Sequence, residues 1–292
     1  MPTVTTKYSS NERRRMFPND NFPSDIPPVR SSNVGESVRT SSAFRIGSPA
    51  AQKNAMSLSV FFPCHNEEGN VERVTRSALD VLATISPDYE VIIVNDGSSD
   101  RTADIANRLA AEHVCVRVVH HRHNQGYGAA LRSGFRAATK EWVFYTDGDG
   151  QFDLNELPRL VTLASRADIV SGYRTVRRDS WLRSLNAMAW GLLIGVTLRL
   201  WVRDVDCAFK LYRREIFDHI EIHSTGALID AEILARAQRC GYTIVQTGVC
   251  HHPRICGTQS GARLKVITRA FWELFRLRKS ILKQPRTRPR HQ

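Results

Sequence analysis

The chain has 292 residues, of which 42% are hydrophobic and 24% are charged. This is enough apolar material for one sizeable core and too little for a membrane-embedded helix bundle. The 41 lysines and arginines exceed the 29 aspartates and glutamates and give a net charge of +12, which predicts an acidic partner such as a phosphorylated substrate, an anionic membrane surface or a nucleic acid. The six cysteines include no Cys-x-x-Cys pair and are too sparse for a disulfide scaffold, so a reducing compartment is expected.

The first 55 residues are polar and rich in proline and serine. Half of the 12 prolines of the chain lie there, interleaved with Ser, Asn and Arg. Such a composition cannot bury enough apolar surface to offset the entropy lost on ordering. We therefore expect residues 1–55 to form a disordered leader.

From residue 57 onward, short apolar runs alternate with stretches of helical periodicity. The runs are nearly continuous in Val, Ile and Phe, as buried parallel strands are, and we expect strands at residues 58–62, 91–95, 114–119, 142–146 and 168–172. One helix face is marked by Val71, Val74, Ala78, Leu82 and Ile85, and a second helix is expected after a cap at 98–100. The alternation predicts an α/β domain over residues 56–261, with a mostly parallel central sheet flanked by helices.

Polar clusters follow four of these strands, at the carboxyl ends where open parallel sheets bind ligands. They occupy residues 63–68, 95–100, 123–128 and 146–151. In the fourth cluster, two glycines let the backbone turn tightly enough for Asp147, Asp149 and Gln151 to face one point. A lone Asp-Gly-Asp-Gly run is commonly a solvated turn, but its place after a buried strand favours a metal site. Oxygen ligands of this kind suit Mg or Mn, which would bridge diphosphate oxygens.

Other cofactor sites find little support in the sequence. The first loop is not a Gly-x-Gly-x-x-Gly turn, the Gly-x-Gly at 126–128 lacks a third glycine at the required spacing, and no Walker phosphate loop exists. Cys250 and Cys256 flank two histidines at a spacing that matches no recognised zinc finger. We expect His251 and His252 to end a strand instead.

Five motifs read FPCHNE (residues 62–67), VNDGSSD (94–100), DGDGQ (147–151), GYR (172–174) and DCAFKLYRR (206–214). With these motifs, residues 58–260 resemble the family 2 glycosyltransferases, and most of all the branch of dolichyl-phosphate and polyprenyl-phosphate sugar synthases. The resemblance implies a GT-A fold, a nucleotide-sugar donor, a divalent metal and inversion at the anomeric carbon.

The resemblance also implies roles for individual residues. It assigns the nucleoside to Pro63, His65, Glu67 and Asp96, the metal to Asp147, Asp149 and Gln151, and phosphate groups to Arg174, Arg183 and Arg254. The sequence departs from the family pattern at His65, where Tyr is usual, and after Arg254, where a Gly-x-Ser-Lys is often found. A lysine contact to phosphate is therefore missing from the expected donor site.

The expected mechanism follows from charge. Breaking a sugar–phosphate bond builds positive charge at the anomeric carbon and negative charge on the leaving nucleoside diphosphate. A metal at Asp147 and Asp149 and a basic group such as Arg174 would therefore act catalytically by stabilising the transition state. A hydroxyl acceptor would also need a general base, for which Asp230 and Glu232 are the candidates. A lipid phosphate, with a second pKa of about 6, needs none, and these two residues would then be structural or positioning groups.

Two segments predict contact with a membrane surface. Residues 187–202 are apolar, but they are interrupted by Arg199 and are shorter than the roughly 20 residues that span a bilayer, so we expect them to lie in the interface. Residues 262–292 are expected to form a basic amphipathic helix, with apolar side chains at helical spacing up to 283, and a basic tail. The alternative is a helix packed on the core with a solvated basic face.

These observations give one main hypothesis and two alternatives. The main hypothesis is a metal-dependent transferase, peripheral on the cytoplasmic face of a membrane, that moves a sugar from a nucleotide-diphosphate sugar to a polyprenyl phosphate. An anionic membrane surface and a membrane protein are further candidate partners. The first alternative is a related enzyme that glycosylates a hydroxyl of a glycan, lipid or protein. The second is a nucleic-acid-binding protein, which no aromatic platform or recognised binding motif supports.

Overall fold

The computed structural model describes residues 56–175, 181–226, 228–254 and 264–283, with the side chains of 181–188 and 264–272 excepted. All of these residues belong to one structural unit, Ala50–Gln292. The expected leader at 1–55 and the expected basic tail after 283 lie outside the described residues.

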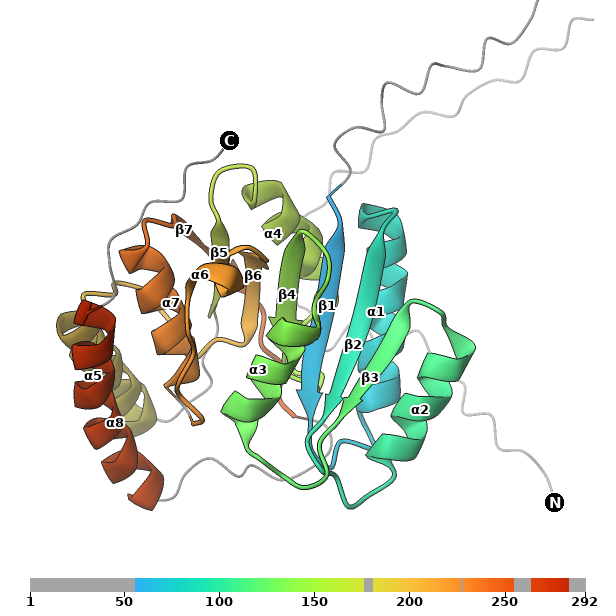
Figure 1. Cartoon of the computed structure of the whole chain (residues 1–292), viewed down its shortest axis with the longest axis horizontal. Helices are drawn as coiled ribbons and strands as arrows, with labels where there is room; N and C mark the ends of the chain where they lie inside the picture. Colours follow the sequence, from blue (N-terminus) through green and yellow to red (C-terminus); the bar gives the residue numbers. More distant parts are fainter. Residues whose placement is uncertain (1–55, 176–180, 227, 255–263, 284–292) are drawn as a thin grey trace, which may run out of the picture. The chain divides into compact units, whose positions relative to one another are not determined.

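Seven strands form one sheet in the order β3-β2-β1-β4-β6-β5-β7 (Figure 1). Their bounds are β1 Leu58–Cys64, β2 Tyr89–Asn95, β3 Val116–His120, β4 Trp142–Thr146, β5 Ile169–Arg174, β6 Phe209–Arg213 and β7 Ile244–Val249. Neighbouring strands are parallel except at β6, which is antiparallel to β4 and β5. The five predicted strands are all present. The strand expected to end at His251 and His252 is β7, which stops at Val249, and His251 forms only an isolated antiparallel bridge with Phe152.

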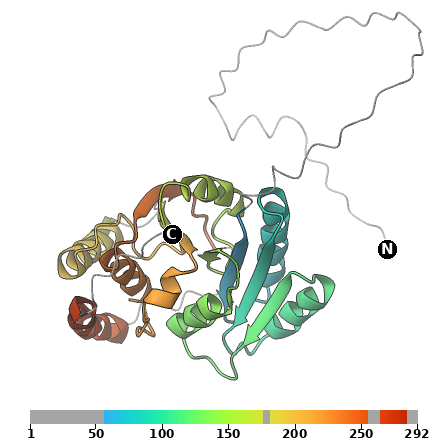
Figure 2. The same ribbon diagram turned by 45° about the horizontal axis from the view of Figure 1, so that its top comes forward.

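Helices cover both faces of the sheet (Figures 1 and 2). One face carries α1 (Val71–Ile85), α2 (Thr102–Glu112), the 3-10 helix η3 (Leu154–Glu156) and α4 (Leu157–Leu163). The other carries α3 (Tyr127–Ala137), α5 (Trp181–Leu198), α6 (Ile216–His219), α7 (Ile229–Arg239) and α8 (Leu264–Lys283). On this second face, α8 packs against both α5 and α7. The layers are those of the α/β fold that the alternating sequence pattern predicts.

The two faces of the sheet have separate apolar cores because successive strand residues point to opposite sides. From β1, Phe61 packs against Phe135 of α3 and Tyr145 of β4, with ring centroids 4.8 and 5.6 Å away. Its neighbours Val60 and Phe62 enter the other core, together with the buried face of α1. The predicted apolar face of α1 is therefore confirmed as a core face.

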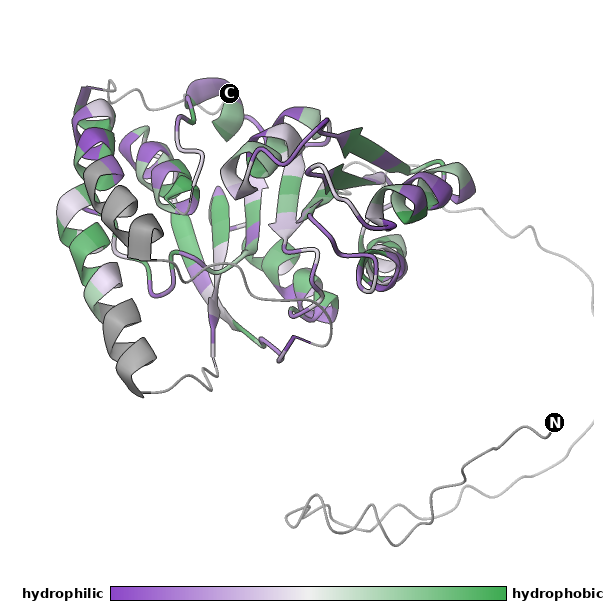
Figure 3. Ribbon diagram, turned by 90° about the horizontal axis from the view of Figure 1, so that it is seen from below, coloured by the Kyte–Doolittle hydropathy of each residue, from purple (hydrophilic) through white to green (hydrophobic). Residues whose placement is uncertain are grey.

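The described side chains of α8 use their apolar stripe mainly inside the protein. Leu274, Leu277 and Ile281 are buried in the core shared with α5 and α7, whereas Phe275 and Leu282 are each half exposed. Figure 3 shows polar and apolar bands alternating along this helix. The expectation of an apolar face turned to a membrane is thus corrected for Leu274, Leu277 and Ile281, because they lie in the core beside α5 and α7.

The neighbouring helix α5 leaves part of its apolar surface uncovered. Ile194 and Leu198 are buried, but Leu192 and Val196 on the helix and Trp201 just after it are 58, 63 and 66% exposed. Among the described residues, no helix combines the length and the apolar character needed to cross a bilayer. The segment predicted to lie in a membrane interface is thus partly core and partly apolar surface.

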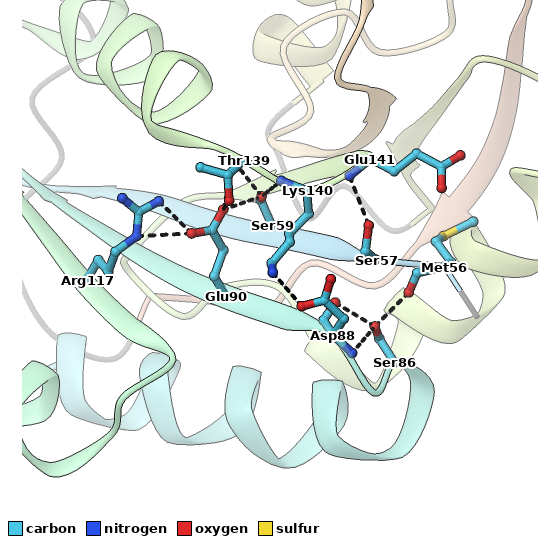
Figure 4. A network of polar contacts seen from close by, with 10 residues as sticks. All are labelled: Met56, Ser57, Ser59, Ser86, Asp88, Glu90, Arg117, Thr139, Lys140 and Glu141. Carbon is cyan, nitrogen blue, oxygen red and sulfur yellow. Dashed lines mark hydrogen bonds and ion pairs between the residues drawn. The ribbon is translucent and has the colours of Figure 1, made fainter. Parts of the chain in front are cut away.

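A polar network joins the amino-terminal ends of β1, β2 and β4, at the edge of the sheet opposite the predicted ligand loops (Figure 4). Glu90 on β2 is buried and accepts hydrogen bonds from Ser59 Oγ at 2.7 Å and from Thr139 N and Oγ1 at 2.7 and 2.8 Å. Arg117 of β3 pairs with its other oxygen at 2.5 Å. Burial alone would raise the pKa of Glu90, but these hydrogen bonds outweigh it and lower that pKa below its ordinary value.

Replacing Glu90 by alanine is expected to lower the free energy of unfolding by about 3 kcal/mol at pH 7, since the buried donors of Ser59 and Thr139 lose their acceptor. A folded-state pKa below the unfolded-state value stabilises the fold fully at neutral pH, and this contribution is lost as the pH falls through the lowered pKa. Urea unfolding at pH 7 and at lower pH values measures the difference in the free energy of unfolding between the parent and the Glu90 variant. This difference should become smaller as the pH falls. Glu141→Ala, at a side chain 59% exposed, is the control and should cost no more than about 0.5 kcal/mol. Equal stability of the Glu90 variant and the parent at pH 7 would contradict the assignment.

Candidate active site

Hydrogen bonds join the first two predicted loops, residues 63–68 and 95–100, at the carboxyl ends of β1 and β2. His65 Nδ1 lies 2.9 Å from the carbonyl oxygen of Asp96. Asn66 N donates to Ser98 Oγ at 3.0 Å, and Asn66 Oδ1 accepts from Ser99 N at 2.8 Å. These bonds cross between loops about thirty residues apart in the chain, so the two loops form one surface.

The carboxylate of Asp96 holds the third predicted loop. Asp96 is buried; Oδ1 accepts from Gln125 N at 2.9 Å and lies 2.6 Å from His121 Nδ1, while Oδ2 accepts from Gly126 N at 2.9 Å. Gly126 has a φ of 90°, a left-handed conformation that favours glycine, and α3 begins directly after it. The observed contacts make Asp96 the organiser of the loop that leads into α3. Its contact with a nucleoside stays a prediction.

Asp147 and Asp149 follow β4 on the loop predicted to hold a metal. Asp147 accepts a hydrogen bond from the Tyr127 hydroxyl at 3.1 Å, and Asp149 accepts one from the backbone N of Gln151 at 3.1 Å. Burial, and next the negative charge of Asp149, raise the pKa of Asp147 to about 7. Burial also raises the pKa of Asp149. The surrounding protein therefore does not fully stabilise the negative charges of Asp147 and Asp149 on this loop.

The glycine between these carboxylates lets the loop lie directly on β1. A Cβ added to Gly148 would lie 2.5 Å from Cys64 Sγ and 2.7 Å from the carbonyl oxygen of Pro63. Such distances are too short for any side chain, so this loop position requires glycine.

Gly148→Ala is accordingly expected to lower the free energy of unfolding by about 1–3 kcal/mol and to reduce catalysis, because the loop must move away from β1. Gly191→Ala on α5 is the matched control, since no atom lies within 4 Å of its added Cβ. Removing that helix glycine should stabilise the protein by about 0.5–1 kcal/mol. Thermal or urea unfolding compares the two variants, and equal midpoints would refute this account of the loop.

Residues from the end of the domain return to the metal loop. His252 N donates to the carbonyl oxygen of Gln151 at 2.8 Å, and the Gln151 side-chain amide donates to the carbonyl oxygen of His252 at 2.9 Å. The Arg254 guanidinium forms an ion pair with Glu67 of the first loop. Its charge also opposes the rise that burial causes in the pKa of Asp149. Four residues predicted for the site are thus brought together.

Arg174, predicted to meet a phosphate group, is held at the end of β5 by Asp204. Arg174 Nε lies 2.7 Å from Asp204 Oδ2, and Nη2 lies 2.9 Å from Oδ1. The Arg174 backbone N also donates to Asp204 Oδ2, at 3.2 Å. The guanidinium is therefore fixed at the same edge of the sheet as the metal loop. Arg183 lies in α5 where side chains are outside the described residues, so its predicted role stays a prediction.

A buried ion pair lies behind the metal loop. Lys210 on β6 has no exposed surface, and its Nζ lies 2.8 Å from Asp230 Oδ1 and 3.1 Å from the Tyr145 hydroxyl. Tyr145 also donates to Asp230 and lies against Tyr127, the partner of Asp147. These contacts favour the structural alternative for Asp230 over the role of general base. The sequence analysis missed Lys210, Tyr127 and Tyr145, although a lysine inside an apolar strand was a usable signal.

Glu232, predicted as catalytic, has contacts that correct this role to a structural one. Its side chain is fully buried, and Oε2 accepts from the backbone N atoms of His223 and Ser224 at 3.1 and 2.6 Å. Oε1 accepts from Arg236 Nε at 2.8 Å. Both oxygens are thus used to fix the loop before α7, and neither is presented to a substrate.

The structure adds a carboxylate that the sequence analysis quoted only within a motif. Asp206 is exposed and precedes β6. Although part of its side chain reaches solvent, the protein packed around the carboxyl group partly desolvates it and, together with the negative charge of Asp230, raises the pKa of Asp206 to about 6. Its other charged neighbours are Lys210, Asp204 and Arg174. Asp206 is therefore close enough to the buried ion pair and to Arg174 to feel their charges, and part of its side chain reaches solvent.

The chemistry of the Asp147–Asp149 pair fits a divalent cation. Carboxylates whose pKa values are raised by burial, and for Asp147 also by the charge of its neighbour, are stabilised by a bound cation. In the described part of the chain, no three or more His, Cys, Asp and Glu side chains are grouped as a metal centre. Two carboxylates nevertheless suffice for Mg²⁺, which commonly completes its coordination with water and substrate phosphates. The side-chain oxygen of Gln151 is the third predicted ligand.

Comparison with known proteins identifies relatives of the chain. Residues 59–221 match the family described as Glycosyl transferase family 2. The chain is 32% identical over 215 residues to Glycosyltransferase AglD of Haloferax volcanii, covering 70% of this chain and 34% of that protein. It is 31% identical over 217 residues to Undecaprenyl-phosphate 4-deoxy-4-formamido-L-arabinose transferase of Pectobacterium carotovorum subsp. carotovorum, covering 72% of this chain and 64% of that protein. The chain thus spans less than two thirds of the length of both relatives.

Solved structures share the fold. Glucosyl-3-phosphoglycerate synthase from Mycobacterium tuberculosis, in complex with Mn²⁺, UDP and phosphoglyceric acid, superposes with a TM-score of 0.57 at 21% identity, covering 79% of this chain and 80% of that one. Mannosyl-3-phosphoglycerate synthase from Rubrobacter xylanophilus gives a TM-score of 0.59 at 18% identity, covering 81% and 79%. These similarities confirm the expected GT-A fold. Since the family match covers more than half of the chain and includes the first, second and metal loops, the chain belongs to glycosyl transferase family 2.

Proposed function

We propose that the enzyme transfers a sugar, with inversion, from a nucleotide-diphosphate sugar to a polyprenyl phosphate, and that it requires Mg²⁺ or Mn²⁺. The observation that carries this proposal is the convergence of three charged groups at one edge of the sheet. They are the Asp147–Asp149 pair, the Glu67–Arg254 ion pair, and Arg174 with Asp206 beside it. Acidic oxygens for a cation and arginines for phosphates are what such a transfer needs.

The donor would lie across the first two loops and the metal loop. The nucleoside would rest against Pro63 and His65, whose ring is fixed by the Asp96 backbone. The departing diphosphate would face Arg254, which Glu67 holds in place and which neutralises the charge that develops there. A cation bound by Asp147, Asp149 and Gln151 would supply Lewis-acid stabilisation of that same charge. The M. tuberculosis structure with Mn²⁺ and UDP is consistent with such a donor and metal.

The name of the Pectobacterium relative supports a polyprenyl phosphate as the acceptor. A phosphate with a second pKa of about 6 is largely ionised at neutral pH and attacks without a general base. Both predicted bases, Asp230 and Glu232, are buried in ion pairs, which agrees with such an acceptor. Asp206 is the observation that favours the rival, a hydroxyl acceptor, because an exposed carboxylate with a pKa of about 6 suits a general base. The family assignment favours either enzyme over the nucleic-acid-binding protein.

A transfer assay with the purified protein tests the proposal. A panel of nucleotide-diphosphate sugars is offered with a polyprenyl phosphate and, as the matched control, with the corresponding polyprenol. We expect product from the phosphate with one donor class, in the presence of Mg²⁺ or Mn²⁺, and none from the polyprenol. Product from the polyprenol alone would establish the hydroxyl rival, and Asp206→Asn should then abolish it.

We further propose that the enzyme is peripheral on the inner face of a membrane and that it rests there mainly on α5. The exposed apolar side chains Leu192, Val196 and Trp201 lie next to Arg199 and Arg203, and residues 189–203 contain no acidic residue. Apolar groups, a tryptophan and arginines on one surface are typical of interfacial segments on anionic lipids. The exposed cations at the end of α8 would add attraction to the same lipids.

The double variant Leu192→Glu, Trp201→Glu should bind liposomes of anionic phospholipid with an affinity reduced by about tenfold or more. Two apolar contacts are replaced by glutamates, which the anionic lipids repel. Co-sedimentation measures the loss. Val114→Glu is the control, because Val114 is a fully exposed apolar residue at the far end of the sheet and should leave binding unchanged. Undiminished sedimentation of the double variant would rule out α5 as the contact surface.

A further inference from the structure

We propose that Arg203 is a second phosphate-binding residue of the acceptor site and that the ring of Tyr173 holds it in position. The inference rests on the proposed polyprenyl phosphate acceptor and adds a residue to that same site. Neither residue has a role among those expected from the sequence, in which Tyr173 stands only inside the GYR motif.

The two residues line a cavity of about 270 Å³ at the carboxyl end of β5. Its other walls are Arg174, Thr175 and Asp204. Because β5 runs parallel to β7 and antiparallel to β6, which is itself antiparallel to β4, this cavity opens at the same edge of the sheet as the metal loop. It is large enough for a phosphate group and adjoins the arginine already expected to bind one.

Arg203 is fixed from two directions. Its guanidinium carbon lies 4.5 Å from the centroid of the Tyr173 ring, in cation–π contact. Its backbone N donates to Gln246 Oε1 on β7 at 2.7 Å. The ring itself rests on Gly248 of β7, where an added Cβ would lie 3.3 Å from the ring. The arginine is therefore positioned in advance, so little conformational entropy is lost when it binds an anion.

The charge balance of the cavity identifies Arg203 as the group that attracts an anion. Arg174 is paired with Asp204 through two of its three guanidinium nitrogens, Nε and Nη2, so these two charges largely cancel. Arg203 makes no ion pair with any residue that the structure describes, so the residues that line the cavity carry one positive charge in excess; Asp206, near Arg174, is not part of this lining. A guanidinium stacked by its face on an aromatic ring keeps the N–H groups at its edge free for a phosphate.

The position of the cavity favours the acceptor over the donor. The donor diphosphate is proposed beside Asp149 and Arg254, and β6 separates β5 from the strand that carries Asp149. Arg203 is also only two residues from Trp201, which we place at the lipid surface. A polyprenyl phosphate anchored in that surface would bring its phosphate to Arg203 and Arg174 together.

Steady-state kinetics with a short-chain, water-soluble polyprenyl phosphate test the inference without a membrane. Arg203→Gln should raise the KM for this acceptor about tenfold or more, as expected for the loss of charge-assisted hydrogen bonds, and should change the KM for the nucleotide sugar less than twofold. Arg203→Lys keeps the charge without the planar fork and should give an intermediate KM. Tyr173→Leu should raise the acceptor KM about threefold. Tyr173→Phe keeps the ring and should have an acceptor KM close to that of the parent.

Arg166→Gln is the matched control, because Arg166 is an exposed arginine that precedes β5, at the opposite edge of the sheet from the cavity. Its acceptor KM should equal that of the parent, and circular dichroism should show all variants folded. An Arg203→Gln variant with the parent's acceptor KM, or with an equal rise in both KM values, overturns the inference while the proposed function stands. A parent enzyme that uses no polyprenyl phosphate overturns the proposed function and the inference with it.

Discussion

Asp149→Ala is expected to lower kcat by about a thousandfold or more while the protein stays folded. Asp149 lies on the loop after β4, and its carboxylate accepts a hydrogen bond from the backbone N of Gln151, so its removal costs little structure. Its carboxylate would hold the cation that stabilises charge on the departing diphosphate, and removal of a group that acts in the transition state appears mainly in kcat. Initial rates under saturating donor and acceptor measure the effect.

Chelation should reproduce this loss in the parent enzyme. Asp80→Ala, at an exposed carboxylate on α1, is the control and should keep the parent's rate. Donor binding measured by calorimetry should also lose its dependence on Mg²⁺ or Mn²⁺ in the Asp149 variant. Unchanged turnover of the parent with excess chelator would exclude the metal-dependent mechanism.

Lys210→Met is expected to lower the free energy of unfolding by about 3–5 kcal/mol, because it leaves the buried carboxylate of Asp230 without its cation. Lys210 is fully buried and its Nζ contacts Asp230 and the Tyr145 hydroxyl. Such a loss is a large part of the stability of a typical domain, so the variant is expected to unfold at much lower urea concentration. Urea titration followed by circular dichroism measures the shift.

Two further variants separate this effect from a general loss of lysine. The double variant Lys210→Met, Asp230→Asn removes both charges and should recover part of the stability. Lys140→Met breaks the pair with Asp88, whose side chain is 59% exposed, and should cost less than about 1 kcal/mol. If Lys210→Met and Lys140→Met unfold at the same urea concentration, Lys210 does not stabilise the core in this way.

Local patterns were sufficient to predict the α/β class, five of the strands and the loops that carry the site. Buried parallel strands are continuous apolar runs, and polar residues directly after them fall at one edge of the sheet, so both features can be read from neighbouring residues. The strand β6 was not predicted, and β7 was anticipated only through its end, because both break this pattern. Lys210 interrupts β6, and β7 is only partly buried because it lies at the edge of the sheet.

The partners of the site residues were beyond the reach of the sequence. Glu67 and Arg254 are 187 positions apart, and Arg174 and Asp204 are 30 apart. Which of these side chains meet depends on the order of strands in the sheet, and residue periodicity does not encode that order. For the same reason the sequence left Asp230 and Glu232 as candidate bases, whereas the fold places each of them in a buried ion pair.

The surface proposed to contact a membrane was likewise only partly predictable from the sequence. The helical spacing of apolar residues near the carboxyl end determined that an amphipathic helix forms, but not what covers its apolar stripe. The tertiary structure places Leu274, Leu277 and Ile281 against α5 and α7 and leaves Leu192 and Val196 of α5 exposed. A stripe buries itself against whichever neighbour the topology brings to it, because the hydrophobic effect depends on the area removed from water and not on the identity of the partner.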